Sequence, residues 1–250
     1  MLTIEQDKIS EEIINIRYSD IDFDKTLKPF SLLNFFQDIA SDNAERLGFG
    51  YSFIYPQGLM WVLLKYRIEF NEYPSDVQDL ILRTEPRGCR KLFAYRNFEL
   101  ISGSKTLARA SSTWSLVNFK TMSIVNAENV IAGNPHMSKF EQTENDLTYN
   151  KIPALTQIDF SKEFEVRYND IDVNRHANNG NYIVWALEPL EIDFRQNHKL
   201  KAVDMLFKKE IKYGEKLVSN IQIVDGNTTV HALKHKKTGE DLCLLCCEWS

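Results

Sequence analysis

Cysteine is scarce in this sequence, with 4 residues among 250. A secreted domain framed by disulfides would be smaller and denser in cysteine, so that class is excluded. Three of the four lie in the run CLLCC at 243–247, whose CxxC spacing could hold a metal or a redox pair. A closed zinc site needs four ligands, however, and the flanking leucines and Trp249 are typical of a buried strand. We therefore expect a core strand here, and neither a metal nor a cofactor.

Long apolar runs are also missing. The apolar stretches are short and interrupted by charges, as in GLMWVLLKYRIEF, and none approaches the ~20 residues that cross a bilayer. The first residues, MLTIEQDKISEE, lack the basic and then apolar pattern of a secretory signal. The sequence therefore predicts a cytoplasmic protein without membrane insertion.

An excess of positive charge is absent as well, because 30 Lys and Arg stand against 35 Asp and Glu, a net charge of -5. Nucleic acids and anionic membranes are bound by clustered positive surface, so neither is an expected partner. The 43% hydrophobic content and the modest net charge argue against disorder. A chain of 250 residues can form one large domain or two of ordinary size.

An internal repeat favours two domains. Residues 16–24, IRYSDIDFD, return as residues 166–174, VRYNDIDVN, with Arg, Tyr, Asp, Ile and Asp in the same places. Each copy follows an alternating, strand-like stretch and precedes apolar residues at helical spacing. We expect two related domains, an N-terminal one at 1–135 and a C-terminal one at 159–250, joined by a connector at 136–158.

After each predicted helix the sequence alternates and is punctuated by turn residues. The expected strands are 59–70, 77–86, 89–102, 105–119, 202–212, 216–225, 228–236 and 241–249. The turn between the second and third of these is expected at Pro86-Arg87-Gly88. One helix with one antiparallel sheet in each half predicts an α+β fold, in which the helix covers one face of its sheet.

The two copies differ where chemistry could enter. Asp172, Asn174 and His176 lie two residues apart in the second copy, so an extended segment would point them the same way. A carboxylate, an amide and an imidazole can orient and activate water, and N–H groups near Asn179 and Gly180 could bind an oxyanion. The same pattern is also typical of a turn with Asx hydrogen bonds, beside which a histidine is structural.

The run YNDIDVNRHANNGNYIVWALE resembles the signature DxDxNxHxNNxxYxxWxxE of the acyl-acyl-carrier-protein (acyl-ACP) thioesterases. The resemblance extends over most of the chain and implies two tandem hot-dog domains, each an antiparallel sheet wrapped around a long helix. It implies hydrolysis of fatty acyl-ACP thioesters, which releases free fatty acid and terminates fatty acid biosynthesis. Catalytic roles for Asp172, Asn174 and His176 follow from the same resemblance.

The family also has an acidic residue on the first strand after the second helix, often followed directly by cysteine. The matching stretch, LFKKEIKYGE, implies that Glu210 is this acid. Ile211 stands at the position of the cysteine, so a cysteine nucleophile is not available there. Strand parity places Glu210 on the same face as Lys208 and Lys212, as expected of an exposed glutamate in a charged face.

Two mechanisms remain open. Either His176 and Glu210 activate a water, or a carboxylate attacks the thioester and forms an anhydride. Asn174 would position the carbonyl, and the aspartate of the signature would orient the group. The first copy carries Asp24 and Thr26 in place of the amide and the imidazole, so it should be inert.

The resemblance assigns the acyl-chain pocket to the first domain. Candidates for its lining, each equally well explained as hydrophobic core, are Phe35, Phe36, Ile39, Met60 and Trp61. The expected partner is acyl carrier protein, which is acidic and requires a basic dock. The candidates are Arg87, Arg90, Lys91, Lys199, Lys201, Lys208, Lys209, Lys234, Lys236 and Lys237, among which no cluster stands out.

The tandem chain is expected as a monomer or a homodimer. Two other functions stay open on the sequence alone. One is an acyl-coenzyme A thioesterase that uses the same site, and the other is a non-catalytic acyl-binding protein.

Overall fold

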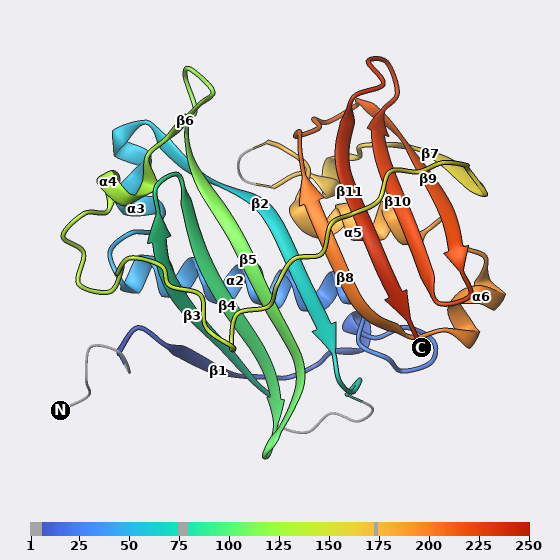
Figure 1. Ribbon diagram of the computed structural model, residues 1–250, viewed down its shortest axis with the longest axis horizontal. Helices are drawn as coiled ribbons and strands as arrows, with labels where there is room; N and C mark the ends of the chain where they lie inside the picture. The colour runs from blue at the N-terminus through green and yellow to red at the C-terminus, as the bar shows by residue number, and fades with distance from the viewer. Residues whose placement is uncertain (1–6, 75–79, 173–174) are drawn as a thin grey trace. The chain divides into compact units, whose positions relative to one another are not determined.

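The computed structural model describes residues 7–74, 80–172 and 175–250 (Figure 1). The chain divides into two compact units. The first unit consists of Met1–Leu27, Asn34–Lys65 and Asn71–Thr148. The second unit consists of Lys28–Leu33, Tyr66–Phe70 and Tyr149–Ser250. The domain bounds expected at 1–135 and 159–250 stay a prediction.

The first unit contains a β-sheet in which β1, β3, β4, β5 and β6 form antiparallel pairs. Its strands, in spatial order, are β1 (Ser10–Ile14), β3 (Leu80–Arg90), β4 (Phe93–Ser102), β5 (Lys105–Asn118) and β2 (Leu59–Phe70), and β6 (Ser123–Val125) pairs with β5. The end of β2, from Tyr66, and the start of α2, up to Leu33, are assigned to the second unit. Its helical elements are η1 (Tyr18–Asp20), α2 (Pro29–Arg46), α3 (Tyr51–Ile54), η2 (Tyr55–Gln57) and α4 (Ala127–Val130). Phe36 of α2 stacks on Phe98 of β4 with ring centroids 4.7 Å apart, which places the helix against this sheet.

The second unit repeats this plan. Its antiparallel strands, in spatial order, are β8 (Leu200–Phe207), β11 (Asp241–Trp249), β10 (Thr228–His235), β9 (Lys216–Asp225) and β7 (Phe160–Glu165). Its helical elements are η3 (Tyr168–Asp170), α5 (Asn179–Leu187) and α6 (Ile192–Asn197). The carbonyl of Ala186 on α5 accepts a 2.8 Å hydrogen bond from Nδ1 of His231 on β10. Each half thus combines an antiparallel sheet with one longer helix, α2 or α5, which confirms the expected α+β, tandem hot-dog fold.

The sequence repeat is also a structural repeat. A single turn of 3-10 helix follows the first strand of each unit, as η1 and η3. The backbone N–H of Arg17 donates to the Asp20 carboxylate at 2.9 Å, and that of Arg167 donates to Asp170 at 2.8 Å. One antiparallel bridge closes the loop that follows in each copy, Ile21 with Leu27 and Ile171 with Ala177.

The turn expected at Pro86-Arg87-Gly88 is wrong, because β3 continues to Arg90 and the chain reverses at Lys91. The register with β4 shifts between Pro86 and Gly88, and such a bulge tolerates a residue that cannot donate to the ladder. Gly88 adopts φ 107°, and a Cβ there would lie 2.3 Å from the carbonyl oxygen of Ser138. The glycine is required by a close backbone approach and not by a reversal.

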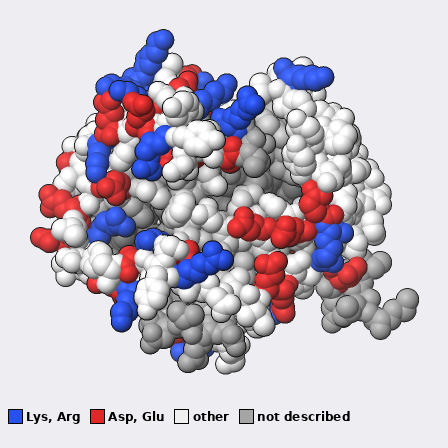
Figure 2. Space-filling model, turned by 180° about the vertical axis from the view of Figure 1, so that it is seen from behind, with Lys and Arg blue, Asp and Glu red and all other residues white. Residues whose placement is uncertain are grey.

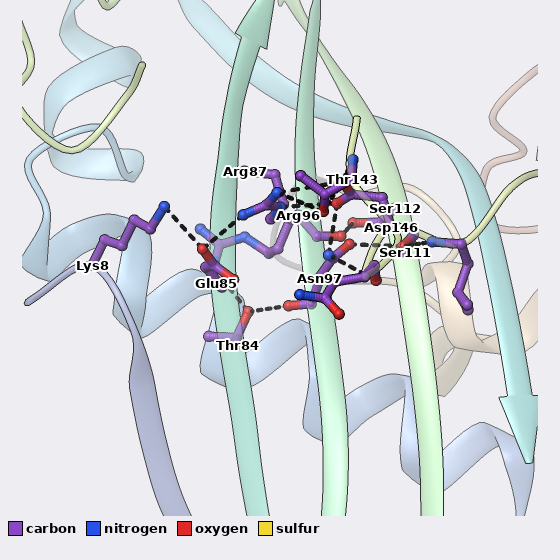
Figure 3. A network of polar contacts seen from close by, with 12 residues as sticks. Lys8, Thr84, Glu85, Arg87, Arg96, Asn97, Ser111, Ser112, Thr143 and Asp146 are labelled. Carbon is purple, nitrogen blue, oxygen red and sulfur yellow. Dashed lines mark hydrogen bonds and ion pairs between the residues drawn. The ribbon is translucent and has the colours of Figure 1, made fainter. Parts of the chain in front are cut away.

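Part of the segment predicted as a connector lies along the first sheet, where a polar network holds it (Figure 3). The Asp146 carboxylate accepts hydrogen bonds from Nε of Arg87 at 2.9 Å and from Nδ2 of Asn97 at 2.7 Å. It also accepts the backbone N–H of Thr143 at 2.7 Å. Burial alone would raise the pKa of Asp146, but these hydrogen bonds hold it below its ordinary value.

The cysteine run forms β11, as the sequence predicted. Cys243 and Cys247 are fully buried, and burial raises the pKa of Cys246 to about 11, so the thiols are poorly suited to redox chemistry. Within residues 7–74, 80–172 and 175–250, no group of three or more His, Cys, Asp or Glu is placed to hold a metal ion. A helix long and apolar enough to cross a bilayer is not found in that part of the chain.

Candidate active site

The loop after η3 forms a tight turn that ends at His176. The N–H of Asp172 donates to the His176 carbonyl at 2.8 Å, and the N–H of Arg175 donates to the Asp172 carbonyl at 3.0 Å. The Asp172 carboxylate in turn accepts the backbone N–H of His176 at 3.3 Å. Asp172 therefore makes the Asx-type hydrogen bond that the pattern allowed, and this bond fixes the backbone that carries the imidazole.

The first copy builds the same turn from different residues. The N–H of Asp22 donates to the carbonyl of Thr26, and the Asp22 carboxylate accepts the N–H of Thr26, both at 2.9 Å. Lys25 and Arg175 both take left-handed φ values, of 58° and 65°. The shared aspartate is thus part of a shared scaffold, on which the second copy places a histidine.

Asn174, also expected in this site, lies outside the described residues. Its role as the group that positions the carbonyl stays a prediction.

A bulge at the end of β8 decides where Glu210 lies. β8 ends at Phe207, and the N–H groups of Lys208 and Lys209 both donate to the carbonyl of Leu242, at 2.8 and 3.2 Å. Two successive residues therefore oppose one, and the alternation along the strand stops there. The strand expected at 202–212 therefore ends earlier, at Phe207, but Glu210 and Lys212 are exposed and Ile211 is buried, as strand parity placed them.

Glu210 is directed to the imidazole, with its Oε2 atom 3.2 Å from Nδ1 of His176. The backbones beside the two residues are joined as well, because the N–H of Ala177 donates to the carbonyl of Ile211 at 3.0 Å. The hydroxyl of Tyr182 on α5 donates to the carbonyl that precedes Glu210, at 3.4 Å. The His176 and Glu210 side chains are 20% and 35% exposed, so the pair is open to a small molecule.

Tyr182 is the tyrosine of the family signature, but no catalytic role was predicted for it from the sequence. It was expected only as an apolar position on the helix, yet it is 2% exposed and bonded through its hydroxyl. Burial raises its pKa well above the ordinary value, so it acts as a neutral donor. A signal was available, because a buried tyrosine, unlike a phenylalanine, needs a hydrogen-bond partner.

The start of α5 offers one N–H group rather than two. The Asn178 side chain caps the helix by accepting the N–H of Gly180 at 2.8 Å. Among the described residues, none accepts the N–H of Asn179. The first turn of a helix also carries a partial positive charge, so the N–H of Asn179 is a candidate donor to an anion.

Four lysines considered for a carrier-protein dock are paired with carboxylates. These ion pairs are Lys208–Asp241, Lys209–Glu240, Lys234–Asp241 and Lys236–Glu163. Figure 2 shows Lys and Arg interspersed with Asp and Glu on the face that it draws. Paired surface charges create little net field, so these lysines do not define a basic dock.

Of the side chains considered for an acyl-chain pocket, Phe36 and Ile39 are buried in the core, whereas Phe35, Met60 and Trp61 are half-buried. Phe36 and Ile39 are 0% and 1% exposed. Trp61 packs against a buried cluster and donates its Nε1–H to the carbonyl of Phe49 at 3.0 Å. Their lining of a pocket stays a prediction.

Comparison with known proteins gives matches along nearly the whole chain. Residues 7–132 match the family model described as acyl-ACP thioesterase N-terminal domain, and residues 154–250 match that of the acyl-ACP thioesterase C-terminal domain. A chloroplastic acyl-[acyl-carrier-protein] hydrolase of Cuphea viscosissima is 26% identical over 262 residues, which cover 98% of this chain and 63% of that protein. An Arabidopsis thaliana oleoyl-acyl carrier protein thioesterase is 24% identical, covering 89% of this chain and 68% of that protein.

Solved structures share the fold. The crystal structure of an acyl-ACP thioesterase from Bacteroides thetaiotaomicron has a TM-score of 0.87 at 23% identity, over 98% of this chain and 99% of that chain. The 12:0-ACP thioesterase from Umbellularia californica has a TM-score of 0.83 at 18% identity, over 97% of both chains. The present chain spans 63% of the length of the Cuphea viscosissima hydrolase named above and 61% of the length of a second hydrolase from the same plant.

Proposed function

Because the chain belongs to the acyl-ACP thioesterase family, we propose that it hydrolyses fatty acyl-ACP thioesters and releases free fatty acid. One observation carries the proposal: Glu210 lies 3.2 Å from the imidazole of His176, which a hydrogen-bonded turn holds in place. The first copy has the turn with Thr26 in place of the histidine, so the chemistry is assigned to the second unit.

The pairing suggests which nitrogen acts as the base. An ionised carboxylate only accepts hydrogen bonds, so Glu210 favours the tautomer in which Nδ1 of His176 carries the proton. Nε2 is then unprotonated and takes a proton from water as the water oxygen attacks the thioester carbonyl carbon. Since the Glu210 carboxylate is engaged with His176, this route is favoured over direct attack by the carboxylate.

The remaining steps follow from the same groups. The oxyanion of the tetrahedral intermediate is stabilised by the N–H of Asn179 at the start of α5. As the carbon–sulfur bond breaks, the imidazolium returns its proton to the leaving sulfur, so the products are a fatty acid and the carrier thiol. Asp172 positions His176 through the turn. By the family signature, Asn174 is assigned the role of positioning the thioester carbonyl.

The test is a comparison of two substrates that differ in their carrier. The purified chain is incubated with acyl-ACP and with acyl-coenzyme A of the same acyl chain, over several chain lengths, and thiol release is followed. We expect kcat/KM to be highest for acyl-ACP, with free fatty acid as the product identified by mass spectrometry. Equal or faster turnover of acyl-coenzyme A would contradict the assignment of the carrier protein, and no thiol release from either would contradict hydrolysis itself.

The route is tested by a single turnover in water labelled with oxygen-18, with enzyme in excess over substrate. Attack by water places one label in every fatty acid molecule. An anhydride with Glu210 that is opened at the glutamyl carbonyl would instead give unlabelled fatty acid and labelled protein.

A further inference from the structure

A cavity of about 570 Å³ opens beside the candidate catalytic turn, within the second unit. It is lined by Tyr168, Ile171, Asp172, Arg175, Lys212 and Tyr213. Two segments supply these residues, one around η3 and the turn that ends at His176, the other just after Glu210. The two segments are held together by the bridge between His176 and Lys212. The cavity therefore lies beside the segments that carry His176 and Glu210, although neither of these two side chains lines it.

Two exposed cations line this cavity, Arg175 and Lys212. In the part of the chain that the structure describes, neither charged group has an ion-pair or hydrogen-bond partner. The paired lysines of the same unit, such as Lys208 and Lys234 with Asp241, are different in this respect. Two unpaired cations beside a concave surface are suited to an anionic ligand, and a guanidinium suits a phosphate oxygen pair best.

The cavity also has two aromatic residues that the core does not cover. Tyr168 is 75% exposed and Tyr213 is 63% exposed, and their rings meet edge to face with centroids 6.5 Å apart. Exposed aromatics around a concavity are typical of ligand contact, since each combines an apolar ring with a hydroxyl. A phosphate alone would use little of this surface, whereas a chain with amides and methyl groups would use all of it.

The left-handed backbone of Arg175 does not indicate a ligand. Lys25, at the same place in the first copy, has nearly the same φ, 58° against 65°. The conformation belongs to the turn and not to a ligand. It does make Lys25 a matched control for the charge of Arg175.

We propose that this cavity binds the phosphopantetheine arm of the acyl thioester, with Arg175 and Lys212 at its phosphate and the two tyrosines against the arm. The proposal rests on the proposed thioesterase function. The long stems of the two cations let their charges reach solvent, away from the backbone beside His176. The arm can then extend from the phosphate to a thioester at the imidazole. We assign the phosphate bound by Arg175 and Lys212 to the phosphodiester of a carrier protein. Coenzyme A carries a similar phosphate on its own pantetheine arm.

The test uses two small thioesters with the same acyl chain, acyl-phosphopantetheine and acyl-pantetheine, which differ only in the phosphate. We expect the wild type to favour the phosphorylated substrate by about ten-fold in kcat/KM, chiefly through KM. The double variant Arg175→Gln/Lys212→Gln should lose this preference, so that its kcat/KM becomes about equal for the two thioesters. Lys25→Gln should retain the wild-type preference.

Acyl-ACP and acyl-coenzyme A identify the source of the phosphate. A loss of about ten-fold with acyl-ACP in the double variant supports the carrier-protein arm, whereas a loss confined to acyl-coenzyme A overturns that assignment. An unchanged ratio for the two small thioesters, with both still hydrolysed, overturns the phosphate subsite and leaves the thioesterase function intact.

Binding provides a readout that does not depend on turnover. Calorimetric titration with phosphopantetheine and with pantetheine should show tighter binding of the phosphorylated compound to the wild type and to Lys25→Gln. The double variant should bind both equally. Equal binding by the wild type overturns the subsite even if no thioester is cleaved, and failure of the proposed function alone would leave the binding difference in place.

Discussion

Nδ1 of His176 lies 3.2 Å from Oε2 of Glu210, although one residue ends the turn after η3 and the other follows the bulge after β8. The N–H of Ala177 joins the two segments by donating to the carbonyl of Ile211. The pair thus depends on backbone contacts as well as on the side chains. If the imidazole is the base, the two residues should act as one unit in catalysis.

Removal of the imidazole tests this most directly. We expect His176→Ala to lower kcat by about 10³-fold, the size of a general-base contribution, without unfolding the protein. Glu210→Gln should lower kcat by about 10- to 100-fold because the ring loses the partner that fixes its tautomer. Steady-state kinetics with circular dichroism measures both. Thr26→Ala, at the equivalent place in the first copy, should leave kcat within about two-fold.

Coupling between the two residues is measured by the double variant. Residues that act as a unit give losses that do not add. His176→Ala/Glu210→Gln should therefore be about as slow as His176→Ala alone. Full multiplication of the two losses would show that Glu210 acts independently of the imidazole, and full activity of His176→Ala would remove His176 from the mechanism.

The two aspartates of the repeat should respond differently to the same change. Asp172 and Asp22 each accept a backbone N–H within their turns, from His176 and Thr26. Asp22→Ala should lower the free energy of unfolding by about 1 kcal/mol, the net value of a hydrogen bond, and leave kcat unchanged. Asp172→Ala should lower kcat by about ten-fold or more, because the turn that it stabilises carries the imidazole.

The conservative variant separates position from charge. Asp172→Asn keeps an oxygen that can accept the His176 N–H, so a positioning role predicts recovery of most of the kcat lost in Asp172→Ala. If kcat does not recover in Asp172→Asn although circular dichroism shows an intact fold, the negative charge of Asp172 is required for the chemistry.

The sequence predicted the repeat, the strands and the helices well because these depend on periodic burial, which is visible in one dimension. It placed β2 at 59–70 and β9 at 216–225, as observed. The turn at Pro86-Arg87-Gly88 was misplaced because proline and glycine are typical of both bulges and reversals. Only the approach of Ser138, from a distant part of the sequence, distinguishes the two cases.

The candidate site shows the same limit. Local spacing suggested the turn that carries Asp172 and His176, since its hydrogen bonds lie within five residues. The direction of Glu210 could not be obtained in this way. It is set by the shared carbonyl of Leu242, to which two successive N–H groups donate, and this contact is made across strands. Strand parity placed Glu210 on the exposed side, as observed, but it could not show that the carboxylate meets His176.

Gly88 provides a test of the bulge in β3. A methyl group there would lie 2.3 Å from the Ser138 carbonyl oxygen, and φ 107° disfavours any side chain. We expect Gly88→Ala to lower the free energy of unfolding by about 2 kcal/mol or more, measured by urea denaturation. Gly226→Ala, where a Cβ meets nothing within 4 Å, is the control and should change it by less than about 0.5 kcal/mol. Equal effects of the two variants would contradict the close approach.

A buried histidine outside the candidate site makes stability depend on pH. His231 is 0% exposed, and burial lowers its pKa from 6.5 to about 4, although the hydrogen bond to Ala186 works the other way. The carbonyl of Ala186 can only accept, so Nδ1 carries the proton and Nε2 accepts from the hydroxyl of Thr229, 2.7 Å away. Trp249 completes the chain by donating its Nε1–H to Thr229 at 2.9 Å. The neutral ring is therefore fully bonded, and a second ring proton would displace the Thr229 hydroxyl.

This arrangement should destabilise the fold as the pH falls from about 6.5 to about 4. In that range the unfolded chain binds a proton at His231 and the folded chain does not, so stability is complete above the range and is lost through it. The pKa difference of about 2.5 units corresponds to about 3 kcal/mol. We expect urea unfolding at pH 7.5 and pH 4.5 to show this loss of stability in the wild type. His235→Gln, a control at a histidine that is only half-buried, should show the same loss. His231→Gln should be less stable at pH 7.5 but lose less between the two values, and an equal loss would mean that His231 does not carry the dependence.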